Sequence, residues 1–193
     1  MKSNVGVYFL LTRLMEVGMN SDKIRMLART AVLLAVVVAV QMVGRSLPNN
    51  SFIVGPLVNM CLLIAVMTAG IGGGIAISIL TPFTSLIGNN APIAAALLPF
   101  APVIAVSNVI LVLVFYFLYN KSKYIGVVCA AVLKFVFLFL SIRLFVNIFD
   151  FPKFAKNLVL LFSWPQLITA LIGGFVALPI IIGVKKATKR NNM

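Results

Sequence analysis

The chain has 193 residues, of which 62% are hydrophobic and only 10% are charged, and its mean hydropathy is +1.15. Soluble domains contain about 45–50% apolar and roughly 25% charged residues. Because a chain of this length has too little interior to hide so much apolar surface, the composition excludes a soluble fold. It predicts an all-α membrane protein, a bundle of transmembrane helices.

The charge is strongly unbalanced, with 16 basic residues, three acidic residues and a net charge of +13. In a soluble protein this excess would indicate a nucleic-acid partner. Here the basic residues lie beside long apolar runs and not in a patch with interleaved aromatic residues. We therefore expect no nucleic-acid partner and interpret the charge as a topology signal.

The first segment, residues 1–26, contains a continuous apolar stretch only at Val5–Leu11, which is too short to cross a bilayer. We expect a cytoplasmic or interfacial segment, with a translation start at Met19 or Met26 as the alternative. Residues 27–190 are expected to form a single transmembrane domain.

Apolar runs of near-spanning length predict six transmembrane helices, since a hydrocarbon core requires about 20 apolar residues per helix. A tight turn is expected at Gly70–Gly74, a break at Pro82 and a polar loop at Gly88–Pro92. The six runs are Thr30–Gly44, Pro56–Gly70, Ile75–Ile87, Leu97–Tyr119, Tyr124–Phe145 and Leu158–Val184.

Six crossings place both termini on one side of the membrane. With the termini in the cytoplasm, eleven basic residues lie inside, four lie outside (Arg45, Arg143, Lys153 and Lys156), and Lys134 lies within the membrane. Lys and Arg are enriched in cytoplasmic loops. The sequence therefore predicts two cytoplasmic termini.

The first predicted helix carries Ala31, Ala35 and Ala39 at four-residue spacing, with Ala28 on the same stripe. Small residues at this spacing let another helix approach closely, either within the same bundle or from another protein. Gln41 projects about 120° away from the stripe. Arg45 follows Gln41 by one turn and either contributes to a site or is an interfacial snorkelling residue.

Lys134 lies near the middle of the fifth run, where a charge costs about 2.5–3.5 kcal/mol on insertion scales. No acidic residue lies in any predicted span. A bound anion, water or backbone carbonyl groups must therefore satisfy the amine, or the amine is neutral. We favour a ligand contact over structural hydrogen bonding and over a lipid-facing, snorkelling lysine.

Further polar side chains lie in four of the predicted helices. Each alone is more often an interhelical hydrogen bond than a ligand contact, and Trp164 is more typical of an interfacial aromatic belt than of a ring stacked on a flat ligand. If they converge on one outward-opening cavity, they form a polar site in an apolar wall. The predicted site residues are Gln41, Arg45, Asn59, Asn108, Lys134, Trp164 and Gln166.

Missing motifs narrow the function. The sequence has no His and no G-x-x-x-x-G-K-[ST] motif, and its two cysteines, Cys61 and Cys129, have no metal-ligand spacing. We therefore expect no catalytic residues, no metal, no cofactor and no ATP site. The missing intramembrane acids disfavour a proton-driven carrier, so we expect a partner to supply the energy for any uphill transport.

The length, the six spans, the basic start and the Ala-x-x-x-Ala repeat together resemble the S-component of energy-coupling-factor (ECF) transporters, from roughly Arg25 to Arg190. The resemblance implies a multi-pass subunit of a bacterial-type plasma membrane that captures a vitamin or similar micronutrient. It further implies a transmembrane coupling subunit and two cytoplasmic subunits that hydrolyse ATP.

The resemblance also implies roles for particular residues. Ala31, Ala35 and Ala39 would form the docking face for the coupling subunit, and the loops at 45–56 and 88–92 would enclose the substrate together with the fourth to sixth helices. Arg45 and Lys134 would then be charge partners for an acidic substrate.

Two alternatives from other classes stay open. One is a stand-alone secondary carrier, in which the six helices form a half that dimerises. The other is a structural membrane scaffold without a small-molecule site.

Overall fold

The computed structural model describes residues 21–45, 51–86, 97–148 and 155–191, and this part of the chain forms helices joined by short turns, without strands. The all-α prediction is therefore confirmed. The elements are α2 (Ser21–Gly44), α3 (Ser51–Thr68), α4 (Gly70–Leu86), the short 3₁₀ helix η1 (Leu98–Phe100), α6 (Ala101–Tyr119), α7 (Lys123–Ile148), α8 (Ala155–Leu161) and α9 (Trp164–Asn191).

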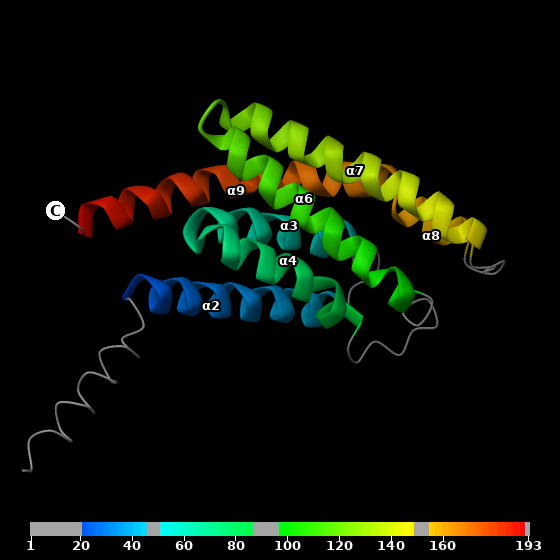
Figure 1. The fold of residues 1–193 in the computed structure, drawn as a ribbon, viewed down its shortest axis with the longest axis horizontal. Helices are drawn as coiled ribbons and strands as arrows, with labels where there is room; N and C mark the ends of the chain where they lie inside the picture. The colour runs from blue at the N-terminus through cyan, green and yellow to red at the C-terminus, as the bar shows by residue number, and fades with distance from the viewer. Residues whose placement is uncertain (1–20, 46–50, 87–96, 149–154, 192–193) are drawn as a thin grey trace, which may run out of the picture.

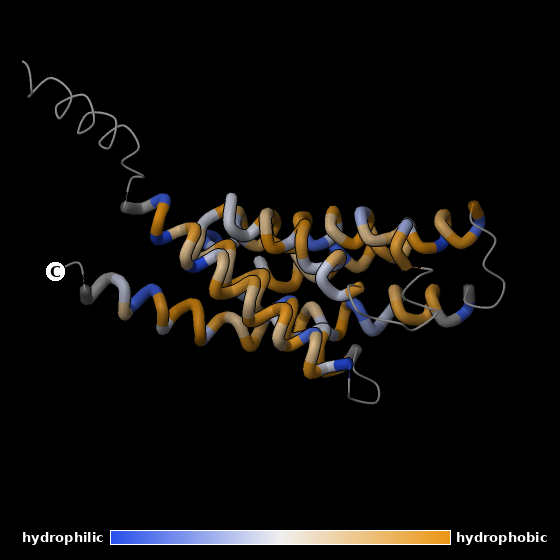
Figure 2. Tube along the Cα trace, turned by 90° about the horizontal axis from the view of Figure 1, so that it is seen from below, coloured by the Kyte–Doolittle hydropathy of each residue, from blue (hydrophilic) through white to orange (hydrophobic). Residues whose placement is uncertain are grey.

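Four stretches of the described chain, at 23–44, 98–119, 123–148 and 158–188, are long and apolar enough to cross a membrane. The helices α3 and α4 are apolar but shorter. Figure 2 shows hydrophobic residues along the length of the bundle and hydrophilic residues at the start of α2 and the end of α9. The fold is consistent with the predicted six-helix membrane bundle.

The bundle is elongated, and α3 packs against α2, α4, α6 and α9 (Figure 1). The first turn of α2, the turn between α6 and α7 and the last turns of α9 lie at one end, which we call the turn end. The helices α2, α4 and α7 finish at the opposite end, where α3, η1 and α9 begin, and we call this the cavity end. The side of the membrane that each end faces stays a prediction.

Two groups of buried apolar side chains hold the helices together. The larger one runs through the middle of the bundle and is built around α3, with Leu62, Leu63 and Val66 fully or almost fully buried. The smaller one lies at the cavity end, where the Phe100 ring packs on Phe145 and Phe162 at centroid distances of 4.9 and 5.1 Å. This smaller group fixes η1, α7, α8 and the turn after α8 around the cavity described below.

The predicted tight turn at Gly70–Gly74 is wrong beyond its first residue. Only Gly70 has a positive φ, of +80°, and α4 already begins at this residue. A Cβ atom on Gly74 would lie 2.9 Å from Cα of Val66, and one on Gly73 would lie 2.5 Å from Oγ1 of Thr30. These glycines therefore serve close packing of α4 against α3 and α2. The expected break at Pro82 is also wrong, because α4 continues through it.

The predicted sixth helix, Leu158–Val184, is two helices. The chain leaves the helical conformation at Phe162 and Ser163, between α8 and α9. Pro165 lies in the first turn of α9, where a missing N–H removes no helical hydrogen bond.

The predicted N-terminal segment lies outside the described residues up to residue 20, and residues 21–26 belong to α2. The predicted loop at 88–92 also lies outside them.

Candidate functional site

A cavity of about 270 Å³ opens at the cavity end of the bundle. This volume is just below the range of about 300–1,000 Å³ typical of small-molecule sites. Six of the seven predicted site residues line it: Gln41, Arg45, Asn59, Asn108, Lys134 and Gln166. Side chains from α2, α3, α6, α7 and α9, far apart in the sequence, therefore meet around one space of small-molecule size.

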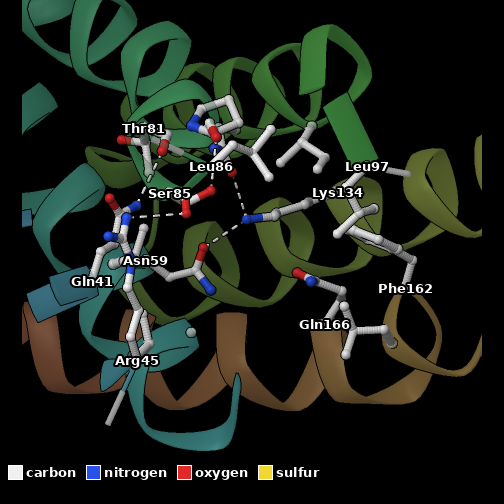
Figure 3. Close-up of a pocket in the computed structure, with 17 residues that line it drawn as sticks. Gln41, Arg45, Asn59, Thr81, Ser85, Leu86, Leu97, Lys134, Phe162 and Gln166 are labelled. Atoms are coloured by element: carbon white, nitrogen blue, oxygen red, sulfur yellow. Dashed lines mark hydrogen bonds between the residues drawn. The ribbon is translucent and has the colours of Figure 1, made fainter. Parts of the chain in front are cut away.

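Lys134 of α7 is the buried cation of this cavity, with only 4% of its surface exposed. Its Nζ donates hydrogen bonds to Oδ1 of Asn59 and to Oδ1 of Asn108, each 2.7 Å long (Figure 3). A lysine ammonium has three N–H donors, and the third has no partner among the described residues. The lipid-facing interpretation of Lys134 is thus wrong.

The helical period of α7 explains why Lys134 points into the bundle. Ala130, Ala131 and Leu138, three or four residues away, are fully buried and lie on the same face of the helix. The small side chains of this face let α7 approach its neighbours closely, which brings the lysine within reach of amides on α3 and α6.

Gln41 and Arg45 fasten the last turns of α2 to the last turns of α4. The Nε2 of Gln41 donates to the carbonyl of Thr81 at 3.1 Å, and its Oε1 accepts from the Thr84 hydroxyl at 2.9 Å. The Nη2 of Arg45 donates to the carbonyls of Thr84 and Ser85 at 3.2 and 3.3 Å. Carbonyl groups at a helix C-terminus carry partial negative charge, so those of Thr84 and Ser85 stabilise the guanidinium group.

Gln166 and Trp164 differ in position although they are two residues apart. Gln166 lines the cavity (Figure 3), and its side-chain amide has no hydrogen-bond partner within the described residues. Trp164 does not line the cavity. It is 68% exposed, and its ring stacks on Phe135 with the centroids 5.6 Å apart. The structure does not bring Trp164 together with the other predicted site residues.

A polar face of α4 also borders the cavity and was not among the predicted site residues. Thr81 and Ser85 line the cavity, and the carbonyl of Ser78 lies 3.5 Å from Nδ2 of Asn108. The hydroxyl of Ser78 is buried and lacks a partner in the described part of the chain. Spacings of three and four residues put these three hydroxyl residues on one helix face, a signal that the sequence did contain.

The described residues that line the cavity carry charge of one sign. Arg45 and Lys134 are the charged residues among them, and the other polar groups in this part of the lining are amides and hydroxyls. The described residues also contain no group of three or more His, Cys, Asp or Glu side chains that could hold a metal ion. A cavity with this lining is suited to an acidic molecule that also forms hydrogen bonds with uncharged amide and hydroxyl groups.

The small-residue face of α2 is open. Ala28, Ala31, Ala35 and Ala39, which we call the alanine ridge, are all exposed, and no described segment covers them. Gln41 is buried toward the cavity at the same time. One helix thus presents small side chains outward and polar side chains to the cavity.

Four helices long enough to cross a membrane, around an open cavity lined by cations and amides, are typical of a multi-pass membrane protein with a small-molecule site. Residues 25–184 match the family model described as ECF transporter, substrate-specific component. The chain therefore belongs to this family, as the resemblance implied, and is a substrate-binding transporter component and not an enzyme. Comparison with curated proteins and with solved structures found no match.

Proposed function

We propose that this S-component captures a vitamin or similar micronutrient with an acidic group outside the cell. It delivers this substrate through a coupling subunit driven by two cytoplasmic ATPase subunits. The observation that carries the proposal is the hydrogen-bonded Lys134 at the wall of the cavity, which has neutral partners and a third N–H to offer.

An acidic substrate is supported by the chemistry of these partners. Hydrogen bonds from an ammonium to a carboxylate or phosphate are shorter and roughly twice as strong as bonds between neutral groups. Lys134 now donates to two amide oxygens. An anion near its third N–H would gain a charge-assisted bond, and Arg45 provides a second cation in the same lining.

The remainder of the substrate would contact neutral groups. The amide of Gln166, which has no side-chain partner among the described residues, offers both donors and an acceptor. The hydroxyl groups of Thr81 and Ser85 donate to backbone carbonyls and offer acceptor oxygens. The apolar walls include Leu97 and Phe162 (Figure 3). A small ligand with one acidic end and an apolar or amide-bearing body fits this lining.

The distribution of basic residues supports an outward-facing cavity. The turn end carries Lys23, Arg25, Arg29, Lys121, Lys123, Lys185 and Lys186, whereas the cavity end carries Arg45, Arg143 and Lys156. Because basic residues favour the cytoplasmic side, we place the turn end and both termini in the cytoplasm of a bacterial-type cell.

The alanine ridge supports docking of the coupling subunit. An exposed strip of small side chains on a spanning helix gives lipid little to pack against but lets a foreign helix approach closely. Ala31, Ala35 and Ala39 are the proposed contact residues.

The decisive experiment identifies what copurifies with the protein. The chain is purified alone in mild detergent, and bound small molecules are released and analysed by mass spectrometry. We expect one acidic micronutrient, which then binds to the purified chain alone and enters cells only when the coupling subunit and ATPases are present.

Two other outcomes would overturn the proposal. Uptake by the lone chain that collapses when an ion gradient is removed would identify a secondary carrier. Absence of binding across a vitamin panel, together with stable assembly into a cell-wall synthesis complex, would identify a scaffold.

A further inference from the structure

A second cavity, of about 540 Å³, lies at the turn end of the bundle. We call it the turn cavity. One side is formed by residues 119–124, which connect α6 to α7, and the other by Phe175, Leu178, Pro179 and Ile182 of α9. It shares no lining residue with the cavity around Lys134.

Lysines gather on the polar side of the turn cavity. Lys121 and Lys123 line it directly. The Nζ of Lys123 lies 5.8 Å from the centroid of the Tyr119 ring, and the Nζ of Lys185 lies 4.2 Å from the same centroid. Two ammonium groups over one aromatic ring repel each other, and each is also attracted by the face of the ring.

These lysines lack internal counter-ions. The whole sequence has only three acidic residues, and no ion pair joins Lys121, Lys123 or Lys185 to a carboxylate within the described residues. The partial positive charge at the N-terminus of α7 adds to the positive potential of these lysines. A negatively charged group from outside the chain would therefore be stabilised here.

The other side of the turn cavity is apolar and open. Phe175 and Ile182 are each 44% exposed, and the Tyr124 ring lies 6.5 Å from the Phe175 ring between centroids. On a membrane-spanning helix these side chains face lipid, and a tyrosine at the end of a span is typical of the membrane–water interface. A free inorganic anion would leave this apolar side without a partner.

We propose that the turn cavity binds an anionic phospholipid, with its phosphate against Lys121, Lys123 and Lys185 and its acyl chains along Phe175 and Ile182. Basic pockets between membrane helices suit acidic headgroups. The acyl chains supply the apolar partner that a soluble phosphate lacks. This lipid site does not depend on the identity of the micronutrient or on docking to a coupling subunit.

The test measures lipid selectivity of the full chain by native mass spectrometry in mixed micelles of phosphatidylglycerol and phosphatidylcholine. We expect the unmodified chain to retain phosphatidylglycerol preferentially. Each of Lys121→Gln, Lys123→Gln and Lys185→Gln should lower this preference about fivefold, the effect expected for one lysine near an anionic lipid surface. The matched control is Arg143→Gln, an exposed cation near the other end of α7, which should leave it unchanged.

Three further measurements separate the sources of the anion and verify folding. Ile182→Gln should weaken phosphatidylglycerol binding, because it removes an apolar contact for the acyl chains. Inorganic phosphate should compete poorly with the lipid for the unmodified chain. Unchanged thermal unfolding of the lysine variants ensures that the loss is local.

Equal retention of the two lipids, or an equal loss in Arg143→Gln, would overturn the proposal. Competition by inorganic phosphate as effective as that by lipid would assign the site to a free anion. Lysine variants that keep their lipid preference but lose assembly with the coupling subunit would assign the lysines to a protein partner.

Discussion

At the scale of single residues, Lys134 is held inside the bundle by two neutral amides. Bonds of 2.7 Å to Asn59 and Asn108 satisfy two of its donors, and within the described part of the chain no carboxylate pairs with its charge. A buried ion pair would have to be broken before an anion could bind, at a cost of several kcal/mol. The neutral partners of Lys134 impose no such cost on an acidic ligand.

Lys134→Met should weaken binding of the acidic ligand by about tenfold or more, because a hydrogen bond to a charged group contributes roughly 1.5–3 kcal/mol. Isothermal titration calorimetry on the purified chain measures this change. Arg143→Met removes an exposed cation that lies over the Phe139 ring and should leave the affinity unchanged. Equal affinity of Lys134→Met and the unmodified chain would remove Lys134 from the site.

Asn108→Asp tests the role of charge while Lys134 is retained. A carboxylate at this position would lie within hydrogen-bonding distance of Nζ and offset the charge of Lys134, so the affinity for an acidic ligand should fall severalfold. The same calorimetric measurement applies, with Asn120→Asp at the exposed end of α6 as the control. Tighter binding in Asn108→Asp would indicate a cationic substrate instead.

The individual site residues were predictable to different degrees. Lys134, Asn59 and Asn108 stand out because polar groups are costly within apolar spans. Trp164 was a weaker prediction, since the sequence does not show which way a ring at the start of a helix points, and here it stacks on Phe135. The polar face of α4, with Ser78, Thr81 and Ser85, was not predicted because Pro82 suggested a break in that helix.

At the scale of helices, hydropathy predicted the existence and approximate limits of six apolar helical segments, four of them long enough to cross a membrane, but not their packing. The glycines Gly73 and Gly74 suggested a turn, yet they allow α4 to approach its neighbours. The same composition serves turns and close helix contacts, so only the neighbouring helix decides between them. The break between α8 and α9 was missed for a similar reason, because apolar residues continue across it.

Gly173→Ala should destabilise the contact between α9 and α3. A Cβ atom there would lie 2.4 Å from the carbonyl oxygen of Pro56 and 2.9 Å from Cβ of Asn59. Since the backbone must move, we expect the free energy of unfolding to fall by about 1–3 kcal/mol, which is measured as a lower midpoint of thermal unfolding. Ligand binding should also weaken, because Asn59 would be displaced. Gly183→Ala, with no atom within 4 Å, should be neutral or slightly stabilising. Equal behaviour of the two variants would contradict the packing described here.

Ala35→Leu should block transport and leave ligand binding intact, because a leucine would fill the exposed alanine ridge without touching the cavity. Uptake in cells with the complete transporter is compared with calorimetry on the lone chain. The control is Val36→Leu, which projects about 100° away on the same helix. Loss of both uptake and binding in Ala35→Leu would point to misfolding and would not support a docking face.

At the scale of the whole molecule, the ends of the bundle differ in charge, and the sequence predicted this asymmetry from loop composition alone. A topology follows that can be measured. In a background with Cys61 and Cys129 replaced by serine, Ser122→Cys should react with a membrane-impermeant maleimide only after permeabilisation. Lys156→Cys should react in intact cells. The reverse pattern would place the cavity in the cytoplasm and contradict capture from outside.

The hydrogen bonds of Arg45 link the cavity to α2, the helix that carries the alanine ridge. Its guanidinium group holds the carbonyl end of α4, yet it also lines the cavity. A ligand that attracts this group competes with the carbonyls of Thr84 and Ser85 and so loosens the attachment of α2 to α4. A bound ligand would thereby let α2, the helix that carries the alanine ridge, tilt more freely relative to α4. A docking partner could then distinguish a loaded subunit from an empty one by the position of α2.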